Sequence, residues 1–593
     1  MALVFWTLIR VSVMKSFAPL RLLAAALAVA LLAPLSLRAA PADELLRLVP
    51  DDAGFCLVVR DLRGHSKALL GSPFAQRFRE SAVGKSLLAQ PEWKKLEAVE
   101  QQLQKHFGAG WERLRDDVLG DAVVLAYRPG PPGKPEQEQD LVLVHARDPK
   151  LLADLVSRIH EAQKRSGELK GLEARTHKGQ TYWQRTEAKK TNYAYLHGPL
   201  LAVSSQEEVL RRAIERHLEP GGQEPAAARQ MRRLGADKAL ATLWINPRPF
   251  EADIAAKAER AKGDEAAVLR NFVRWWKALD AVGLSLNVTD RLELTLTVLA
   301  RPEQLSPAAR RFLAEAGKPS ELWQRFPDNA LLAAAARIDA AALYELLGDF
   351  LTPDSRQSLR NALEQNFGAA LGKKDVIRTV LPHLGPDVGL CVLAPPQDKA
   401  SRERQPPEAW FPHAVLACKV GPAGRVDEAT LSAAQFYAQL AVFAHNRHHD
   451  DAITIEKERQ GDVEVRYLVN DRRFPPGFRP AFALQGGYLT LASSPEALRR
   501  FAALPSRPIS STGEVPLLRM SLKNLRQFLA DRHDALAAAV AEQNKLPKEE
   551  AAKQLRRLAE ALAPLDRLEL ACRSESGRAS LALRVRTAWP LRK

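Results

Sequence analysis

The sequence predicts an α+β fold built as a tandem duplication, in which each copy is a largely antiparallel sheet with helices packed mainly on one face. Three observations lead to this prediction. The segment Gly198–Arg212 (GPLLAVSSQEEVLRR) recurs as Gly486–Arg500 (GGYLTLASSPEALRR). Strand hairpins are mixed with amphipathic helices along the chain, which is typical of α+β proteins. A chain of 593 residues is also too long for one core and is expected to form about two to four domains.

Four further segments recur in the same order. They are Glu44–Ala53 with Glu321–Ala330, Lys105–Gly110 with Gln365–Ala370, Val118–Tyr127 with His383–Leu393, and Leu279–Val288 with Leu565–Ser574. This period is far too long for a solenoid repeat, so each copy is expected to be a domain. The predicted organisation is a leader (1–42), a first copy (43–304), a linker (305–319) and a second copy (320–593).

The N-terminus has the pattern of a secretory signal peptide from Met14 to Ala42: a basic start, the apolar stretch Leu22–Leu32, then small residues. This stretch is shorter than the roughly 20 residues that a membrane span needs. Cleavage is expected after Ala42, with Ala39 and Ala40 as alternatives. The sequence thus predicts export to the periplasm or the extracellular space. An uncleaved leader that anchors the protein in a membrane remains the alternative, because further apolar residues precede the stretch.

Hydrophobic periodicity predicts the elements of the first copy in order. They are a short helix after residue 43, a strand at 54–62, helical sequence over 72–119, strands at 121–127 and 140–146, a helix at 148–165, short strands at 181–186, 192–198 and 200–205, a capped helix, a strand at 240–246, a long helix that contains 270–279, and a hairpin of 282–288 with 292–300. The Pro- and Gly-rich segment 128–139 is predicted to be an exposed turn.

The hairpin that ends each copy alternates between apolar and polar residues. Leu292, Leu294 and Leu296 alternate with Glu293, Thr295 and Thr297 in the first copy, and Leu581, Leu583 and Val585 alternate with Ala582, Arg584 and Arg586 in the second. Such alternation is typical of a strand with one buried face. The leucine side is therefore expected to be buried, while the other side meets water or another surface.

The recurring segment is predicted to be a strand followed directly by a helix. Ser205 and Ser494 are placed to cap the two helices, and Glu208 would complete a capping box. Pro495 fits the first helical position, where its missing N–H is not needed. A nucleophilic serine is not favoured, because the G-x-S-x-G pattern is missing.

Composition narrows the range of partners. The net charge is +16, but the basic residues are interleaved with acidic ones along predicted helices. No basic block alternates with aromatic residues, so nucleic-acid binding is not favoured. The remaining candidates are an envelope protein or an anionic polymer. The four cysteines are scattered in apolar runs and are predicted to be small buried side chains, with disulfide bonds as the alternative; they are Cys56, Cys391, Cys418 and Cys572.

The strongest pattern for a metal site is HNRHHDD, which begins at His445 and includes His448 and His449. His445 and His449 would lie one turn apart on a helix, a spacing that metals use. The stretch lies at a helix end, however, and the glutamate of an HExxH motif is missing. No phosphate loop or dinucleotide-binding turn occurs elsewhere. The sequence therefore predicts no metal and no cofactor, with these histidines as weak candidates.

The start of the first copy resembles a bacterial family of exported proteins of unknown function. The segments concerned are 48–62 (LVPDDAGFCLVVRDL), 72–78 (SPFAQRF) and 120–130 (GDAVVLAYRPG). The resemblance covers most of the mature first copy and implies neither an activity nor functional residues. The sequence thus predicts a non-enzymatic exported protein that binds or scaffolds a partner in the cell envelope. Two alternatives are a hydrolase whose catalytic residues come from separate loops, and a carrier of an apolar ligand.

Overall fold

The computed structural model describes residues 40–89, 100–101, 103–105, 108–188, 190–219, 224–371, 375–396, 410–504 and 513–591. Nearly all of the predicted leader lies outside these residues. Within them the strands form one continuous sheet of twenty strands, in which all neighbouring strands are antiparallel. The predicted α+β class with a largely antiparallel sheet is confirmed. The predicted separate sheet for each copy is replaced by a single shared one.

Ten strands from residues 55–300 form one half of this sheet. They are β1 (Phe55–Arg60), β2 (Ala122–Arg128), β3 (Gln139–His145), β4 (Leu169–His177), β5 (Gln180–Glu187), β6 (Thr191–His197), β7 (Leu200–Ser204), β8 (Ala241–Ile245), β9 (Leu279–Val288) and β10 (Leu292–Ala300). From the edge inward they lie in the order β4-β5-β6-β7-β3-β2-β1-β8-β9-β10. Strand β4 is the one element here that the periodicity did not predict.

Ten strands from residues 332–587 form the other half. They are β11 (Leu332–Arg337), β12 (Leu384–Leu393), β13 (His413–Val420), β14 (Thr454–Gln460), β15 (Val463–Val469), β16 (Ala481–Gln485), β17 (Tyr488–Ala492), β18 (Val515–Ser521), β19 (Leu565–Glu575) and β20 (Arg578–Thr587). Their order from the edge inward is β14-β15-β16-β17-β13-β12-β11-β18-β19-β20. Strands β10 and β20 pair at the centre and join the halves.

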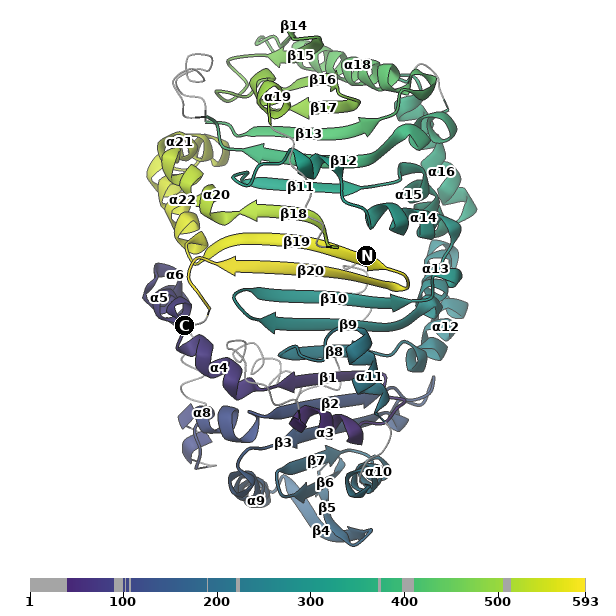
Figure 1. Cartoon of the computed structure of the whole chain (residues 1–593), viewed down its shortest axis with the longest axis vertical. Coiled ribbons are helices and arrows are strands. Elements are labelled where there is room, and N and C mark those ends of the chain that lie inside the picture. The colour runs from purple at the N-terminus through teal and green to yellow at the C-terminus, as the bar shows by residue number, and fades with distance from the viewer. Residues whose placement is uncertain are drawn as a thin grey trace.

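The strands are stacked along the long axis of the molecule, and many helices form two columns at the strand ends (Figure 1). One column contains α12 (Glu251–Arg260), α13 (Gly263–Ala278), α14 (Pro307–Ala316), α15 (Ala340–Asp349) and α16 (Pro353–Leu363). The other contains α4 (Leu62–Leu70), α5 (Pro73–Glu80), α6 (Ala82–Leu88), α20 (Leu522–Asp531), α21 (His533–Asn544) and α22 (Lys548–Leu562). Each column takes helices from both halves of the chain.

One face of the sheet, here called the covered face, bears the main cores. In the first half it packs against α3 (Ala40–Leu48), α10 (Glu207–Leu218) and α11 (Ala226–Arg233), which contribute Leu46, Leu210 and Met231. In the second half it packs against α19 (Pro495–Ala502) through Leu498 and Phe501. These helices bury the side chains of β1–β3 and β11–β13 on this face.

The expectation of helices mainly on one face is wrong, because helices also cover parts of the opposite face. Helices α4 and α5 pack there on β1 and β2, and α9 (Pro149–Arg165) packs on β3. Helix α18 (Val426–Asn446) covers β13 and β17, and α20–α22 pack beside β11 and β12. The reason lies in strands such as β2, whose residues 122–126 are all buried. A continuous apolar run of this kind needs cover on both sides.

The predicted caps are half confirmed. Ser494 caps α19 and accepts a hydrogen bond from the backbone N–H of Ala497 at 3.1 Å. Ser205 is not a cap: its backbone N–H and its hydroxyl both donate to the Asp140 carboxylate on β3. This anchoring holds Ser205 at the strand end, so α10 begins one residue later, after Gln206.

The segment 305–319 contains α14, which clusters with residues of α13 and α15. Trp275 of α13 lies against Phe350, with ring centroids 6.4 Å apart, and Leu591 packs into the cluster of α4 and α5.

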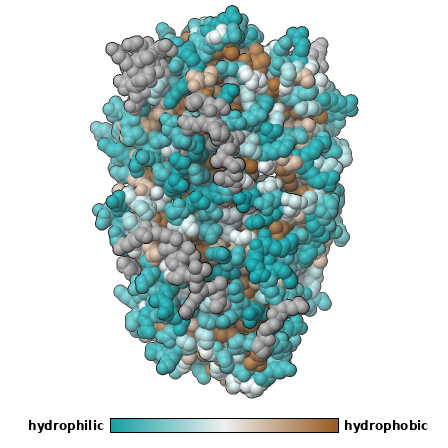
Figure 2. All heavy atoms as spheres, viewed as in Figure 1, coloured by the Kyte–Doolittle hydropathy of each residue, from teal (hydrophilic) through white to brown (hydrophobic). Residues whose placement is uncertain are grey.

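The surface turned to the viewer in Figure 2 is mainly hydrophilic, with apolar residues in separate small areas. Among the described residues, no helix combines the length and apolar character needed to cross a membrane.

Candidate binding surface

The leucine side of the central hairpin is open, which reverses the expectation from its alternation. Leu294 and Leu296 of β10 are each 40% exposed. Thr297, the next residue of the same strand, points to the opposite face and is buried. Thr297 lies opposite Gly283 on the covered face, and the side chain of Leu234, which follows α11, packs directly over Gly283. The protein therefore covers the polar side of this hairpin and leaves its leucines accessible.

These leucines belong to two continuous rows of aliphatic side chains. Directly opposed residues of antiparallel strands point to the same face, so the strand register defines each row. Row A runs through Leu491, Leu416, Leu390, Ala334, Leu518, Leu570, Leu583, Leu294 and Leu286. Row B runs through Leu581, Leu296, Leu284, Leu243, Leu57, Leu125, Val142 and Val203. We call the face formed by both rows the leucine face.

The middle of the leucine face stays accessible because helices cover only its margins. Six of its leucines are 37–43% exposed: Leu284, Leu294, Leu296, Leu416, Leu491 and Leu581. From Leu491 to Leu286 and from Leu581 to Val203, the rows contain no charged, polar or aromatic residue. Scattered exposed leucines are normal on proteins, but a contiguous apolar surface indicates a binding site.

The covered face is charged where the two halves meet. Arg584 of β20 lies between Glu293 of β10 and Glu514, and its Nε, Nη1 and Nη2 atoms each donate to a carboxylate oxygen at 2.6 Å. The Arg584 guanidinium holds the pKa of the Glu514 carboxyl below its usual range. These ion pairs join the halves on the side of the sheet opposite the exposed leucines.

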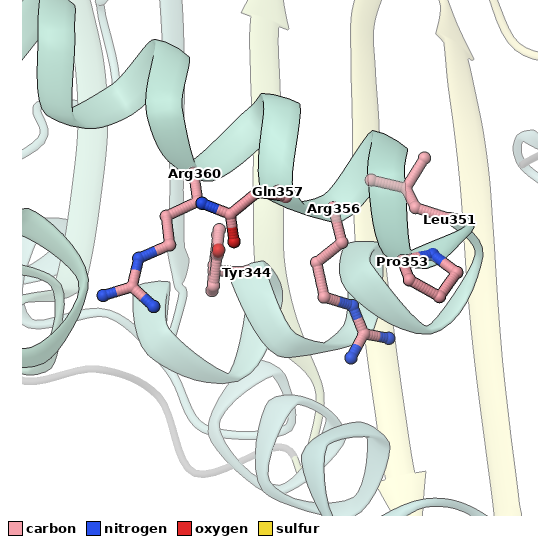
Figure 3. A pocket seen from close by; sticks show the side chains of 6 residues that line it. All are labelled: Tyr344, Leu351, Pro353, Arg356, Gln357 and Arg360. Carbon is pink, nitrogen blue, oxygen red and sulfur yellow. The ribbon is translucent and has the colours of Figure 1, made fainter.

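A pocket of about 300 Å³ lies between α15 and α16, in one of the two helical columns. Its lining residues are Tyr344, Leu351, Pro353, Arg356, Gln357 and Arg360. Figure 3 shows the side chains of Arg356 and Arg360 descending from α16 on either side of Tyr344. Helix α15, which forms the floor of the pocket, also contacts β12, the strand that contributes Leu390 to row A.

The polar groups of the pocket are only partly satisfied within the protein. Arg356 donates through Nε and Nη2 to the backbone carbonyl of Gly348, which leaves Nη1 without a protein acceptor among the described residues. Arg360 lies 3.6 Å from Asp375 and is 40% exposed. In the described part of the chain, the Tyr344 hydroxyl makes no hydrogen bond. The donors that face the pocket are thus Arg356 Nη1, the guanidinium of Arg360 beside Asp375, and the Tyr344 hydroxyl.

The histidines proposed as weak metal ligands lie at the C-terminal end of α18. The rings of His445 and His449 stack with centroids 4.4 Å apart, and His445 Nε2 lies 2.9 Å from the Asp451 carbonyl oxygen. His448 is exposed. Over the described ranges, no three His, Cys, Asp or Glu side chains converge in a way that could hold a metal ion.

The cysteines are free thiols, and Cys56 and Cys391 are fully buried as the sequence predicted. Burial raises the pKa of both thiols to about 12, so they stay protonated at neutral pH. Cys418 and Cys572 are only partly buried, and burial raises the pKa of these thiols as well. None of the four is therefore a candidate nucleophile in the sense of an activated, accessible thiolate.

Sequence reasoning missed both the pocket and the accessibility of the leucine rows. Leu292, Leu294 and Leu296 were singled out, yet alternation cannot distinguish a leucine side that helices cover from one that they leave open. Tyr344 and the two arginines come together only because α15 packs against α16, and no spacing in the sequence indicates that contact.

Comparisons of the whole chain with protein-family models, with curated proteins and with solved structures give no match. The function is therefore inferred from the leucine face and the α15–α16 pocket alone.

Proposed function

We propose that the chain is a tandem duplication of one ten-strand unit. The strand order in each half supports this, because β1–β10 and β11–β20 occupy corresponding places outward from the central pair. The registers correspond as well: Leu57 pairs with Leu125 and Leu243, and Ala334 pairs with Leu390 and Leu518.

Local features favour the same proposal. Rare π-helical turns precede the second strand of each half, at Leu114–Val118 and Val376–Val380. The recurring segments each begin with a glycine in the left-handed region, with φ of 54° at Gly198 and 58° at Gly486. Such a position favours glycine, which has no Cβ. On this correspondence Thr295 and Ala582, which face each other across β10 and β20, lie at the centre of the duplication.

We further propose that the protein is an exported member of the bacterial family that its first copy resembles, with the leader removed. Helix α3 begins at Ala40, and Ala42 is buried in the main core. Cleavage after Ala42 would remove that contact, so we expect a mature N-terminus at Ala40 or Pro41. Intact-mass measurement of the secreted protein checks this. An N-terminus at Asp43 would contradict the packing argument, and an intact Met1 or Met14 in a membrane fraction would contradict soluble export.

For the function itself, we propose a non-enzymatic binding protein that takes an apolar ligand on the leucine face. The observation that supports this most strongly is the pair of continuous aliphatic rows with six accessible leucines. Aliphatic surface left in water costs free energy, at roughly 25 cal/mol per Å². Binding of an apolar ligand to this surface explains why the protein keeps these leucines exposed. Because this surface is open, the ligand is bound on the sheet rather than in an enclosed cavity, where a carrier would hold it.

An uncharged fluorescent apolar probe such as Nile red tests this proposal on the full chain. We expect the double variant Leu294→Gln and Leu296→Gln to bind the probe at least about tenfold more weakly, because two leucines lose their contact with it. Both side chains are already exposed, so the free energy of unfolding should change by no more than about 0.5 kcal/mol each.

The matched control is Leu558→Gln with Leu218→Gln, two exposed leucines on α22 and α10. This control removes the same number of exposed leucines outside the leucine face. Unchanged binding in the control with lost binding in the test variant supports the proposal. Equal effects of the two variants, or no effect of either, would overturn it.

A further inference from the structure

We propose that the ligand is an anionic amphiphile with a long acyl chain, whose chain lies along row A and whose head group enters the α15–α16 pocket. This inference rests on the proposed function and adds the chemical class of the ligand and the place of its charged end. Four observations support it: the composition of the rows, their length, the donors of the pocket, and the absence of its two arginines from the corresponding helix of the first half.

The composition of the rows favours an acyl chain over a protein partner. Protein interfaces are enriched in Tyr, Trp, Phe, Met and Arg. Over the strands given above, rows A and B consist of leucine, with two valines and one alanine. Phe482 and Arg466 beyond row A, and Trp183 beyond row B, follow only towards the outer edges of the sheet. A flat aliphatic strip without aromatic anchors suits a flexible hydrocarbon, for which each buried CH₂ contributes about 0.8 kcal/mol.

The length of row A also suits such a chain. Row A crosses nine strands, and neighbouring strands lie about 4.8 Å apart, which gives a strip of roughly 40 Å. The acyl chains of one bilayer leaflet span about half of the ~30 Å hydrocarbon core. Row A can therefore accommodate a whole long chain in an extended conformation.

The donors around the pocket favour an anionic head group. The full sequence has a net charge of +16; without the four basic residues of the proposed leader the charge is 16 − 4 = +12, which attracts anions at long range. Within the pocket, Arg356 Nη1, the Arg360 guanidinium and the Tyr344 hydroxyl are available as donors. Arginine presents planar paired donors that match carboxylate and phosphate groups.

The two arginines of the pocket are specific to the second half of the chain. On the proposed duplication, α16 corresponds to α5: Thr352 and Ser72 both cap their helices, and a proline follows each. Four and eight residues after these caps, α16 has Arg356 and Arg360, whereas α5 has Gln76 and Glu80. Because the first half lacks both guanidinium groups at these places, the head group is assigned to the second half.

Calorimetric titration of the full chain with three dodecyl compounds tests the inference, each below its critical micelle concentration. All three compounds have the same dodecyl chain and differ in their head groups: dodecyl phosphate is anionic, dodecyl maltoside is uncharged, and dodecyltrimethylammonium is cationic. We expect dodecyl phosphate to bind at least about tenfold more tightly than the other two. Equal binding of all three, lost in the Leu294 and Leu296 variant, would overturn the anionic head group but keep the proposed function. Binding of none would overturn both.

The double variant Arg356→Gln and Arg360→Gln tests the place of the head group. We expect it to weaken dodecyl phosphate about tenfold or more and to leave dodecyl maltoside within about twofold. The charge-matched control is Arg556→Gln with Arg557→Gln, two exposed arginines of α22. An equal loss in the control would show that net charge alone attracts the anion and would overturn the pocket assignment, as would retention of phosphate selectivity in the test variant.

Discussion

Replacing Arg584 with methionine is expected to lower the free energy of unfolding by about 3 kcal/mol. The Arg584 side chain is 13% exposed and donates to Glu293 of the first half and to Glu514. Methionine would leave the two carboxylates facing each other with weaker compensation, from Arg291, whose Nη2 lies 3.4 Å from Glu293 Oε2. The expected value lies near the low end for buried pairs, because Glu514 keeps about a third of its side chain exposed. Urea unfolding at neutral pH measures the effect.

Arg586 on the same strand is the matched control, since it is exposed. Arg586→Met should change the free energy of unfolding by no more than about 0.5 kcal/mol. If Arg584→Met were as mild as the control, the ion pairs across β10 and β20 would not hold the two halves together.

Stability is expected to fall by about 2 kcal/mol between pH 7.5 and pH 5 through His413 alone. Burial, with a smaller contribution from the nearby Arg500 cation, lowers the pKa of His413 to about 4. In the unfolded chain the pKa is about 6.5. The native state therefore holds this histidine neutral, and its contribution is complete above pH 6.5 and is lost as the pH falls from 6.5 towards 4.

His413→Gln removes the titration, so its unfolding free energy should depend less on pH by the same amount. His448→Gln is the control, because His448 is exposed on the same half of the chain. His160 and His217, whose pKa values burial also lowers, add to the trend in both variants equally. An unchanged pH dependence in His413→Gln would show that this histidine is not the group that titrates.

Local patterns were sufficient to predict most of the secondary structure. The alternating hairpins, the continuous apolar strands and the helix at 148–165 lie where periodicity placed them, because backbone pairing and burial impose those periods directly. The cap at Ser494 was predicted for the same reason, since capping depends on neighbouring residues. The predicted cap at Ser205 is wrong, because the Ser205 hydroxyl donates its hydrogen bond to the carboxylate of Asp140, which is distant in the sequence.

The binding surface could not be predicted from the sequence, since it depends on which parts of the sheet the helices cover in the folded protein. The alternation of Leu294 and Leu296 with polar residues is compatible with either outcome. Leu234 covers Gly283 on the polar side, and that single tertiary contact helps to decide which face stays open. The pocket around Tyr344 likewise exists only after α15 and α16 have packed.

Photolabelling with a fatty acid that carries a diazirine near its terminal methyl tests the central claim most directly, because the labelled peptides identify where the chain lies. We expect the cross-links to fall on strands of the leucine face, of which β9, β10, β13, β17 and β20 bear its exposed leucines. Unlabelled dodecyl phosphate should compete with the label. Cross-links confined to exposed leucines of the outer helices, such as Leu558 of α22, or labelling that no competitor reduces, would contradict the assignment of the leucine face as the binding surface.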